Sequence, residues 1–245
     1  MYNILKEYRV KDWFHYLGYI LLGSLASRNL NFINFLLGFF MLSYAYSFND
    51  FFDKKLKNKL FILPLLLSLI FLPFLSKLQL IFYFSFILIF TLYSWPVTYL
   101  EGRPLLSTIS NSIGFLLIFF LPFINIEKLL QFLDFSLLLF LLNTVAQIIH
   151  EIVDYKEDKK NEKITTAVSF GHKNSISLLR LVLIVVFLLS LFLFSRFKFI
   201  SLSTFLFTTY FLFLSYRKVD SKFRKWFKCL GIVCGVTYLL ELVHV

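Results

Sequence analysis

Two oxygen-rich clusters stand where long apolar runs of the sequence end. The first holds Asn49, Asp50 and Asp53, in the run S-F-N-D-F-F-D-K-K, and the second holds Asp154 and Asp158. The members of each of the pairs Asn49/Asp53 and Asp154/Asp158 are four residues apart, so on a helix both side chains point the same way, one turn apart. Like charges at this spacing repel each other unless a cation lies between them.

Carboxylate and amide oxygens are hard ligands that suit magnesium, which usually keeps some waters and binds substrate phosphates as well. Two such clusters facing each other could hold metal ions that bridge one diphosphate. The metals would then neutralise charge on the leaving diphosphate as a carbon–oxygen bond breaks. Basic residues beside the clusters, namely Lys54, Arg103 and Lys159, could complete an anion site.

The composition places the chain in a membrane. It has 245 residues, of which 59% are hydrophobic and only 16% charged, whereas a soluble domain is about half apolar and about one quarter charged. A core of this size cannot hide so much apolar surface from water, so the lipid bilayer must be the solvent. The net charge of +11 is scattered over short segments between apolar runs, which indicates membrane topology and not nucleic-acid binding.

Apolar runs of roughly membrane-spanning length predict an all-α membrane protein of nine transmembrane helices in a single bundle. The third run is the weakest, because it is short and carries Pro64 and Pro73. The expected spans are 13–28, 31–52, 60–76, 78–97, 105–125, 133–153, 174–195, 198–216 and 224–243.

The basic residues orient this bundle. With the N-terminus in the cytoplasm, the inner segments collect 20 Lys and Arg residues and the outer segments collect 5. This asymmetry supports nine spans with the C-terminus outside. Both oxygen-rich clusters then fall on the cytoplasmic side, at the ends of the second and sixth helices, and the expected location is the plasma membrane with the active site facing the cytoplasm.

The domain organisation predicted from the sequence is simple. Residues 1–245 form a single transmembrane domain with no separate soluble part. Its N-terminal half, 1–103, carries the first cluster, and its C-terminal half, 104–245, carries the second.

Three stretches of the chain resemble the UbiA-type intramembrane prenyltransferases. The family's N-D-x-x-D motif appears as Asn49-Asp50-Phe51-Phe52-Asp53. Its D-x-x-x-D motif, followed by a Thr/Ser-x-Ala stretch and Phe/Leu-Gly, appears as Asp154, Asp158, Thr165, Thr166, Ala167 and Phe170-Gly171. The stretch L-Y-S-W-P-V-T-Y-L-E-G-R-P-L-L-S-T-I-S-N resembles the family's loop after the fourth helix. The three stretches occur in the family's order, and the likeness covers nearly the whole chain.

The resemblance implies a central cavity, open to lipid, that takes a polyprenyl diphosphate, with Mg²⁺ bound by aspartates of both motifs. Carried over to this chain, Asn49 and Asp53 face Asp154 and Asp158 as metal ligands, and Asp50 lies beside them. The four aspartates are the expected catalytic residues. Ionisation of the diphosphate ester gives an allylic cation, which the acceptor attacks before a proton is lost. The ring faces of Tyr93 and Tyr99 are candidates to shelter that cation.

Four further polar residues are candidates for lining the cavity: Asn111, Asn143, Gln147 and Glu151. Glu151 has two readings, an acceptor-side base or a residue that supports a metal ligand. The others are expected either to contact the acceptor or to make hydrogen bonds that pack one helix on another. His150 is expected to pack, or to hydrogen-bond at the membrane interface.

Three departures from the family pattern stand near the first and third stretches. Lys57 occupies a position where the family often has a further Asp, the loop after Asp53 is cut to K-L-K-N-K-L, and Glu101 replaces the usual Lys. These departures leave an inactive relative as one alternative. The metal-binding minimum is intact.

The leading expectation is an enzyme that transfers a prenyl group to an aromatic ring of the hydroxybenzoate or naphthoate type, as in quinone-like biosynthesis. The alternative acceptor is a non-aromatic alcohol such as a glycerol phosphate lipid precursor. A cation transporter is disfavoured, because the acidic groups stand at one membrane face and not near the midplane, where carriers usually bind substrate. Phosphatidyl transfer from a CDP-alcohol is disfavoured too, because the sequence lacks the D-G…A-R…G…D…D run.

Overall fold

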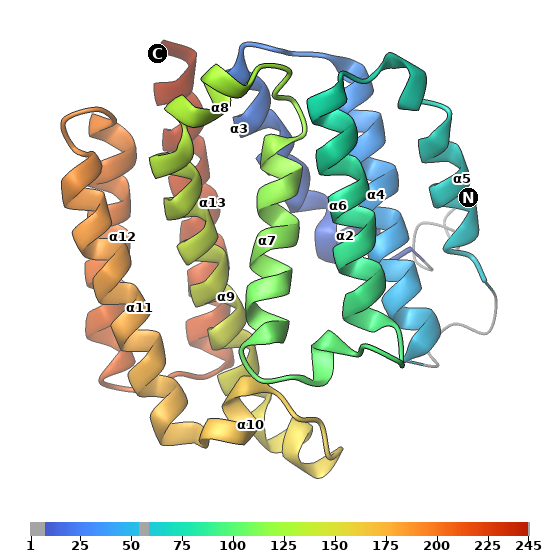
Figure 1. The fold of residues 1–245 in the computed structure, drawn as a ribbon. Helices are drawn as coiled ribbons and strands as arrows, with labels where there is room; N and C mark the ends of the chain where they lie inside the picture. Colours follow the sequence, from blue (N-terminus) through green and yellow to red (C-terminus); the bar gives the residue numbers. More distant parts are fainter. Residues whose placement is uncertain (1–7, 54–58, 245) are drawn as a thin grey trace. The chain divides into compact units, whose positions relative to one another are not determined.

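The computed structural model describes residues 8–53 and 59–244, and these residues form helices joined by short connections, with no strand among them (Figure 1). The chain divides into two compact units. The first comprises Met1–Leu100 and Ile113–Phe132, and the second comprises Glu101–Ser112 and Leu133–Val245. The helix that spans Leu106–Phe120 therefore contributes its first part to the second unit and its last part to the first.

In the first unit, the longest helix packs against three others: α4 contacts α3, α5 and α6. The elements of this unit are α2 (Val10–Trp13), η1 (Phe14–Tyr16), α3 (Leu17–Ser27), α4 (Phe32–Phe52), α5 (Ile62–Leu69), η2 (Leu72–Phe74), α6 (Lys77–Ser94), the last part of α7 (Leu106–Phe120) and α8 (Ile126–Gln131). The short 3₁₀ helix η3 (Leu100–Gly102) stands where the chain passes from the first unit to the second.

Side-chain caps fix where the two long helices of the first unit begin. The Asn31 side chain accepts a hydrogen bond from the Ile33 N–H at the start of α4, and Ser76 and Gln79 cap α6 reciprocally. Such caps satisfy backbone N–H groups that have no partner within the helix. In the same unit, a Cβ added at Gly23 of α3 would stand only 1.9 Å from the Phe119 carbonyl oxygen of α7, so only glycine permits this close approach.

A cluster of apolar side chains lies in the core of the first unit. Trp13, Leu37, Met41 and Phe86 are fully buried in it, together with parts of α3 and α7. The indole N–H of Trp13 donates to the Tyr8 carbonyl at 2.7 Å, so the one polar group of this side chain is satisfied inside the core. The cluster supports α4 along the length that ends in Asn49, Asp50 and Asp53.

In the second unit, α9 contacts α10, α11 and α13, and α12 packs against α11 and α13. The bounds are α9 (Leu133–Lys160), α10 (Thr166–Phe170), α11 (His172–Leu193), α12 (Lys198–Ser215) and α13 (Ser221–His244), preceded by the first part of α7. Polar contacts join α12 to α13. Glu241 accepts a hydrogen bond from the Ile200 N–H at 2.6 Å, and the Thr204 and Tyr238 hydroxyls are in contact at 2.5 Å. Glu241 thus satisfies an N–H near the start of a neighbouring helix.

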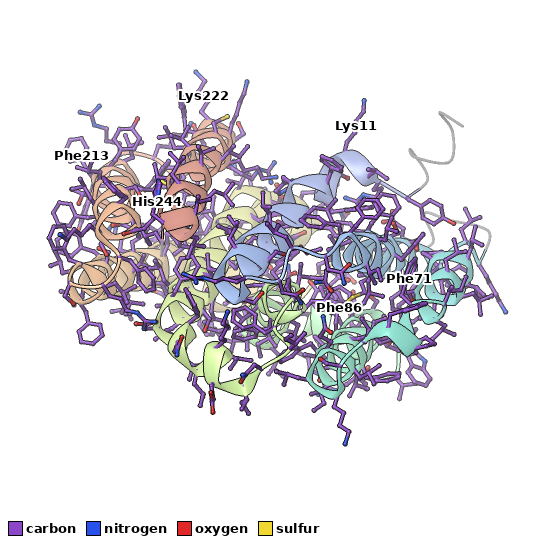
Figure 2. The ribbon with its side chains drawn as sticks, turned by 90° about the horizontal axis from the view of Figure 1, so that it is seen from above. Lys11, Phe71, Phe86, Phe213, Lys222 and His244 are labelled. Atoms are coloured by element: carbon purple, nitrogen blue, oxygen red, sulfur yellow. The ribbon has the colours of Figure 1, made fainter. Side chains whose placement is uncertain are left out.

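In the part of the chain that the structure describes, six helices are long and apolar enough to cross a membrane: α4, α6, α9, α11, α12 and α13. Their outward faces carry large apolar side chains, among them Phe213, which Figure 2 shows directed away from α12. Each of the nine spans expected from the sequence coincides with one of these helices or with a shorter helical segment. The all-helical membrane fold is confirmed, while the count of nine crossings stays a prediction.

Candidate active site

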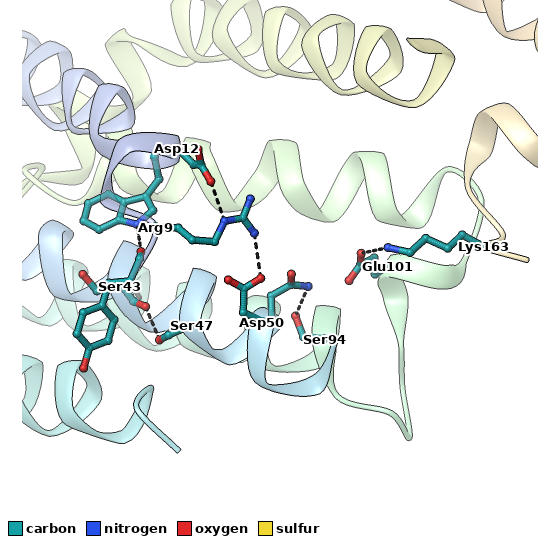
Figure 3. Close-up of polar contacts among 11 residues, drawn as sticks. Arg9, Asp12, Ser43, Ser47, Asp50, Ser94, Glu101 and Lys163 are labelled. Atoms are coloured by element: carbon teal, nitrogen blue, oxygen red, sulfur yellow. Dashed lines mark hydrogen bonds and ion pairs between the residues drawn. The ribbon is translucent and has the colours of Figure 1, made fainter. Parts of the chain in front are cut away.

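The first motif occupies the end of α4. Asn49 and Asp50 lie in its last turn, and Asp53 is its C-cap residue, whose N–H donates to the Asn49 carbonyl at 2.9 Å. The Asn49 side-chain amide donates to the Ser94 hydroxyl at 3.2 Å, at the end of α6 (Figure 3). The helix therefore presents the Asn49 and Asp53 oxygens one turn apart, as the spacing predicted, and Ser94 fixes how the amide points.

An arginine from the N-terminal segment holds the middle residue of this motif. Arg9 donates to Asp50 at 3.0 Å and to Asp12 at 2.7 Å, and Figure 3 shows the guanidinium between the two carboxylates. The Asp50 side chain is only 5% exposed. Burial alone would lower the pKa of Arg9, but the hydrogen bond to Asp12 and the charge of Asp50 outweigh it and raise that pKa above its ordinary value. Arg9 is therefore a permanent cation beside Asp50.

Aromatic rings crowd the same end of α4. The Phe48 ring lies 4.9 Å from that of Phe52 and 5.0 Å from that of Phe61, and the Phe51 ring lies 5.2 Å from Phe61. The negative faces of such rings attract cations. The two tyrosines proposed from the sequence for that role have different surroundings. The Tyr93 ring lies 6.2 Å from the Phe90 ring, whereas Tyr99 is 40% exposed and its backbone adopts the left-handed conformation, with φ 39°.

The second motif stands on a helix that extends beyond the expected membrane span of 133–153. The apolar run ends near residue 153, but α9 continues to Lys160, because the residues that follow, rich in Lys and Glu, also favour helix. Asp154 and Asp158 consequently lie on the same side of its last turns. Both carboxylates are partly exposed.

Two basic side chains approach the first of these carboxylates. One nitrogen of Arg224, Nη1, donates to both oxygens of Asp154, at 3.0 and 2.9 Å. His150, one turn earlier on α9, brings Nδ1 to 2.6 Å from Asp154 Oδ2. Arg224 lies in the first turns of α13, 70 residues further along the chain. His150 thus contacts a proposed metal ligand, where the sequence had suggested only packing or an interfacial hydrogen bond.

Glu151 joins three elements of the second unit. Its side chain is buried, and one oxygen accepts hydrogen bonds from the Thr108 hydroxyl at 2.9 Å and the Gln147 amide at 3.5 Å. The other oxygen accepts from the Ala167 N–H at 3.2 Å. Thr166 accepts from the Leu105 N–H at 3.0 Å and contacts Thr108, which closes the network. Glu151 therefore fixes α7 and α10 against the helix that carries the second motif.

Two of the remaining polar candidates, Asn111 on α7 and Gln147 on α9, continue the same network. The Asn111 amide donates to Gln147 at 2.9 Å, and Gln147 in turn reaches Glu151. Asn143 is 7% exposed. The structure thus brings Asn111, Gln147 and Glu151 together in one chain of hydrogen bonds that links α7 with α9.

A model of the UbiA prenyltransferase family matches residues 57–226, which is more than half of the chain. The chain belongs to the UbiA prenyltransferase family. It is accordingly a prenyltransferase and, with its long apolar helices, a multi-pass integral membrane protein. The transporter alternative falls away with this result. The matched range begins after Asp53, so the likeness of the first motif rests on its own residues.

Solved structures share the fold of this UbiA-family chain over nearly its whole length. A UbiA homolog from Archaeoglobus fulgidus bound to GPP and Mg²⁺ is 17% identical, with a TM-score of 0.74 over 98% of this chain and 99% of that one. The same homolog bound to Cd²⁺ gives 19% identity and 0.76, over 99% of both chains. A structure of digeranylgeranylglyceryl phosphate synthase gives 18% and 0.75, over 98% of both. No match was found among the curated proteins.

The cations proposed from the sequence to bind diphosphate are solvent-facing where the structure describes them. Arg103 and Lys159 are exposed, and within residues 8–53 and 59–244 neither forms an ion pair. Lys54 lies outside the described residues, as does Lys57. Glu101, which stands where the family usually has Lys, lies 3.9 Å from Lys163 (Figure 3). A cation is thus restored beside position 101 by a residue of another segment.

The donor set of this UbiA-family chain fits magnesium. Among the described residues, no group of three or more His, Cys, Asp or Glu side chains is placed to hold a metal ion. Each motif instead supplies two oxygen-bearing side chains one helical turn apart: Asn49 and Asp53 in one unit, Asp154 and Asp158 in the other. Magnesium is ordinarily bound by one or two carboxylates together with substrate phosphates, and not by a closed protein cage.

Several residues of the site carried no local signal in the sequence. Arg9 and Arg224 looked like ordinary topology-setting cations, because nothing near either one marks its aspartate partner 41 or 70 residues away. Thr108 and Thr166 did have a signal, since both stand inside stretches that resemble the family motifs. Local motifs therefore singled out the aspartates Asp50 and Asp154 but not the arginines that pair with them.

Proposed function

We propose that this enzyme transfers a polyprenyl group from an allylic polyprenyl diphosphate to a small acceptor in a magnesium-dependent reaction. The observation that carries the proposal is the pair of motifs at helix ends in a chain of the UbiA family. N-D-x-x-D closes α4 and D-x-x-x-D closes α9, and in each the oxygen ligands share one side of a helix.

Each motif residue has a role in this proposal. Asn49, Asp53, Asp154 and Asp158 supply oxygen ligands to the metal, and Asp50 supports the first motif through its ion pair with Arg9. Bound magnesium would neutralise charge on the diphosphate as it leaves. Arg103 and Lys159, which are exposed, and Lys54 are assigned in the proposal as contacts to the diphosphate oxygens, because basic side chains bind such oxygens through charge-assisted hydrogen bonds.

The proposed cavity residues divide into two groups. Tyr93 and Tyr99 belong with the prenyl chain and the developing allylic cation, together with the Phe48–Phe61 ring cluster at the end of α4. Asn111, Asn143, Gln147 and Glu151 belong with the acceptor side. The hydrogen bonds of Glu151 support its role in fixing the motif helix over its role as a proton acceptor, since its oxygens already accept from Thr108 and Ala167.

The proposed acceptor is an aromatic ring of the hydroxybenzoate or naphthoate type, and the second candidate is a glycerol phosphate lipid precursor. One solved structure of the same fold is that of digeranylgeranylglyceryl phosphate synthase, and for this reason glycerol-type acceptors are included in the activity test below. We place the enzyme in the plasma membrane with its active site toward the cytoplasm. The excess of basic residues on the segments that carry both motifs supports this orientation.

Diphosphate release by the purified enzyme in detergent tests the proposal. Geranyl, farnesyl and geranylgeranyl diphosphates are each combined with aromatic and glycerol-type acceptors, with and without magnesium. Magnesium-dependent release together with a prenylated product supports the function and identifies the acceptor class. Failure of every pair to react, in a protein that binds neither the diphosphates nor a divalent metal, would contradict it.

A further inference from the structure

A positively charged side chain of the protein itself, that of Arg224, forms an ion pair with the proposed metal ligand Asp154. Arg224 reaches both oxygens of Asp154 from α13, a helix that carries none of the family motifs. Neither partner is deeply buried: the side chains of Arg224 and Asp154 are 30% and 27% exposed. An ion pair that is this accessible to solvent can exchange its partners, because water solvates both charges when they separate and the free-energy cost of separation is therefore small.

The guanidinium keeps hydrogen-bonding capacity in reserve. Arginine has five N–H donors arranged as a rigid fork, and the contacts of Arg224 to Asp154 and His150 all use Nη1. Across residues 8–53 and 59–244, no hydrogen bond joins Nε or Nη2 of this side chain to another group. These donors are suited to the oxygens of a diphosphate, which arginine binds in a forked geometry.

A second cation on Asp154 changes the affinity of this carboxylate for the metal ion. Magnesium and the guanidinium repel each other when both stand on one carboxylate, so each weakens the binding of the other. The repulsion is relieved when an anion with several oxygens arrives, since the anion can contact the metal and the arginine at once. The order in which the ligands bind therefore depends on Arg224.

We propose that Arg224 couples metal binding to diphosphate binding, by occupying Asp154 until the diphosphate arrives and then contacting the diphosphate. The inference rests on the proposed function, because it takes Asp154 as a metal ligand. Arg224 lowers the metal affinity of the substrate-free enzyme and raises its affinity for the metal and diphosphate together. An enzyme built this way does not hold a divalent ion tightly without substrate.

The test measures Mn²⁺ binding by electron paramagnetic resonance on the full-length enzyme, first alone and then with inorganic pyrophosphate. Arg224→Gln should bind Mn²⁺ about fivefold more tightly than the wild type without pyrophosphate, because a nearby positive charge is gone. Pyrophosphate should strengthen Mn²⁺ binding less in this variant than in the wild type. A purely structural role would weaken metal binding, so the sign of the change separates the two.

Lys222→Gln is the matched control. Lys222 stands on the same helix and carries the same charge, but it is exposed and Figure 2 shows its side chain extending outward. It should change Mn²⁺ affinity by less than about twofold, the effect of a screened surface charge. Equal gains from both substitutions would mean that only the net charge matters and would overturn the role of Arg224.

Two further variants keep the outcomes distinct. Asp154→Asn should lose most Mn²⁺ binding, and if it binds as the wild type does, the proposed metal site itself is wrong. If Asp154→Asn loses the metal while Arg224→Gln binds it no more tightly than the wild type, the coupling alone is overturned. Should Arg224→Gln not fold, Arg224→Lys keeps a cation without the fork. It should bind Mn²⁺ like the wild type but gain less from pyrophosphate, and a full gain would overturn the proposal.

Discussion

The two motifs are each joined to an arginine far away in the chain, but the arginines meet different positions. Arg9 binds Asp50, which stands beside the Asn49/Asp53 pair and not within it. Arg224 binds Asp154, which belongs to the Asp154/Asp158 pair itself. Arg9 therefore contacts the residue beside the proposed ligand pair of the first unit, whereas Arg224 contacts a member of the proposed pair in the second.

The surroundings of the two contacts differ as well. Asp50 is nearly buried and its arginine also binds Asp12, so separating the pair would remove a charged partner from a carboxylate in a poorly hydrated place. Asp154 and Arg224 are both accessible to water. The comparison assigns a bracing role to Arg9 and an exchangeable one to Arg224, and it can be broken by substitutions in either unit.

The largest effect is expected at the ligand pairs. Asp154→Asn and Asp53→Asn each remove a proposed metal contact, and both should lower turnover by more than about 100-fold, since even the outer partners of metal ligands typically cost 10–100-fold. Product formation at saturating magnesium measures the loss, and circular dichroism shows whether the helices remain. Wild-type turnover in either variant would remove that residue from the proposed metal site.

Glu151 offers the next contrast, because it is a buried carboxylate held by neutral donors and not by an arginine. Glu151→Ala leaves the Thr108 hydroxyl and the Ala167 N–H without their acceptor, which should cost about 3 kcal/mol of stability. Thermal unfolding in detergent measures it. Glu151→Gln keeps one acceptor oxygen and should cost less. Equal stability of the Ala variant and the wild type would show that the network does not fix α7 and α10.

Much of the fold could be predicted from the sequence, because a membrane helix requires a long run of apolar residues that is visible in the sequence. The nine expected spans all coincide with helical segments. The expected membrane span ends at residue 153, and α9 continues to Lys160 because helix propensity persists after the apolar pattern stops.

The residues of the candidate site were predictable from the sequence only where they stand close together in a short motif. Asp154 and Asp158 could be paired from their spacing, since one helix carries both. Arg9, Arg224 and Phe61 reach their partners only through the packing of separate helices. That packing depends on how side chains from distant parts of the chain fit together. The spacing of residues along a single sequence does not reveal this fit.

The Arg9 contact should matter for stability more than for metal binding. Arg9→Gln removes the ion pair with Asp50 and should lower the free energy of unfolding by about 2 kcal/mol, the scale of a hydrogen bond to a charged group. Its Mn²⁺ affinity should stay near that of the wild type, in contrast to Arg224→Gln. Thermal unfolding and Mn²⁺ titration of the same preparations test the comparison. A rise in Mn²⁺ affinity would show that the two arginines act alike.

The smallest effect is expected at Asp220, which caps the helix that carries Arg224. Its Oδ1 accepts hydrogen bonds from the Lys222 and Phe223 N–H groups, at 3.0 and 3.1 Å. The Phe223 N–H, chiefly, lowers the pKa of Asp220 below its ordinary value. Asp220→Ala should cost about 1 kcal/mol, typical of a lost cap.

The pH dependence of that cost follows from the direction of the shift. A lowered pKa means that the ionised cap stabilises the folded state above the ordinary aspartate pKa, and that this contribution is lost as the pH falls through the lowered value. The difference in melting temperature between Asp220→Ala and the wild type should therefore be full near pH 7 and shrink below about pH 4. A difference that persists unchanged in acid would show that Asp220 acts through something other than its ionised cap. Because the cap orders the turn that presents Arg224, the variant should also shift Mn²⁺ affinity in the direction of Arg224→Gln, by less than that substitution does.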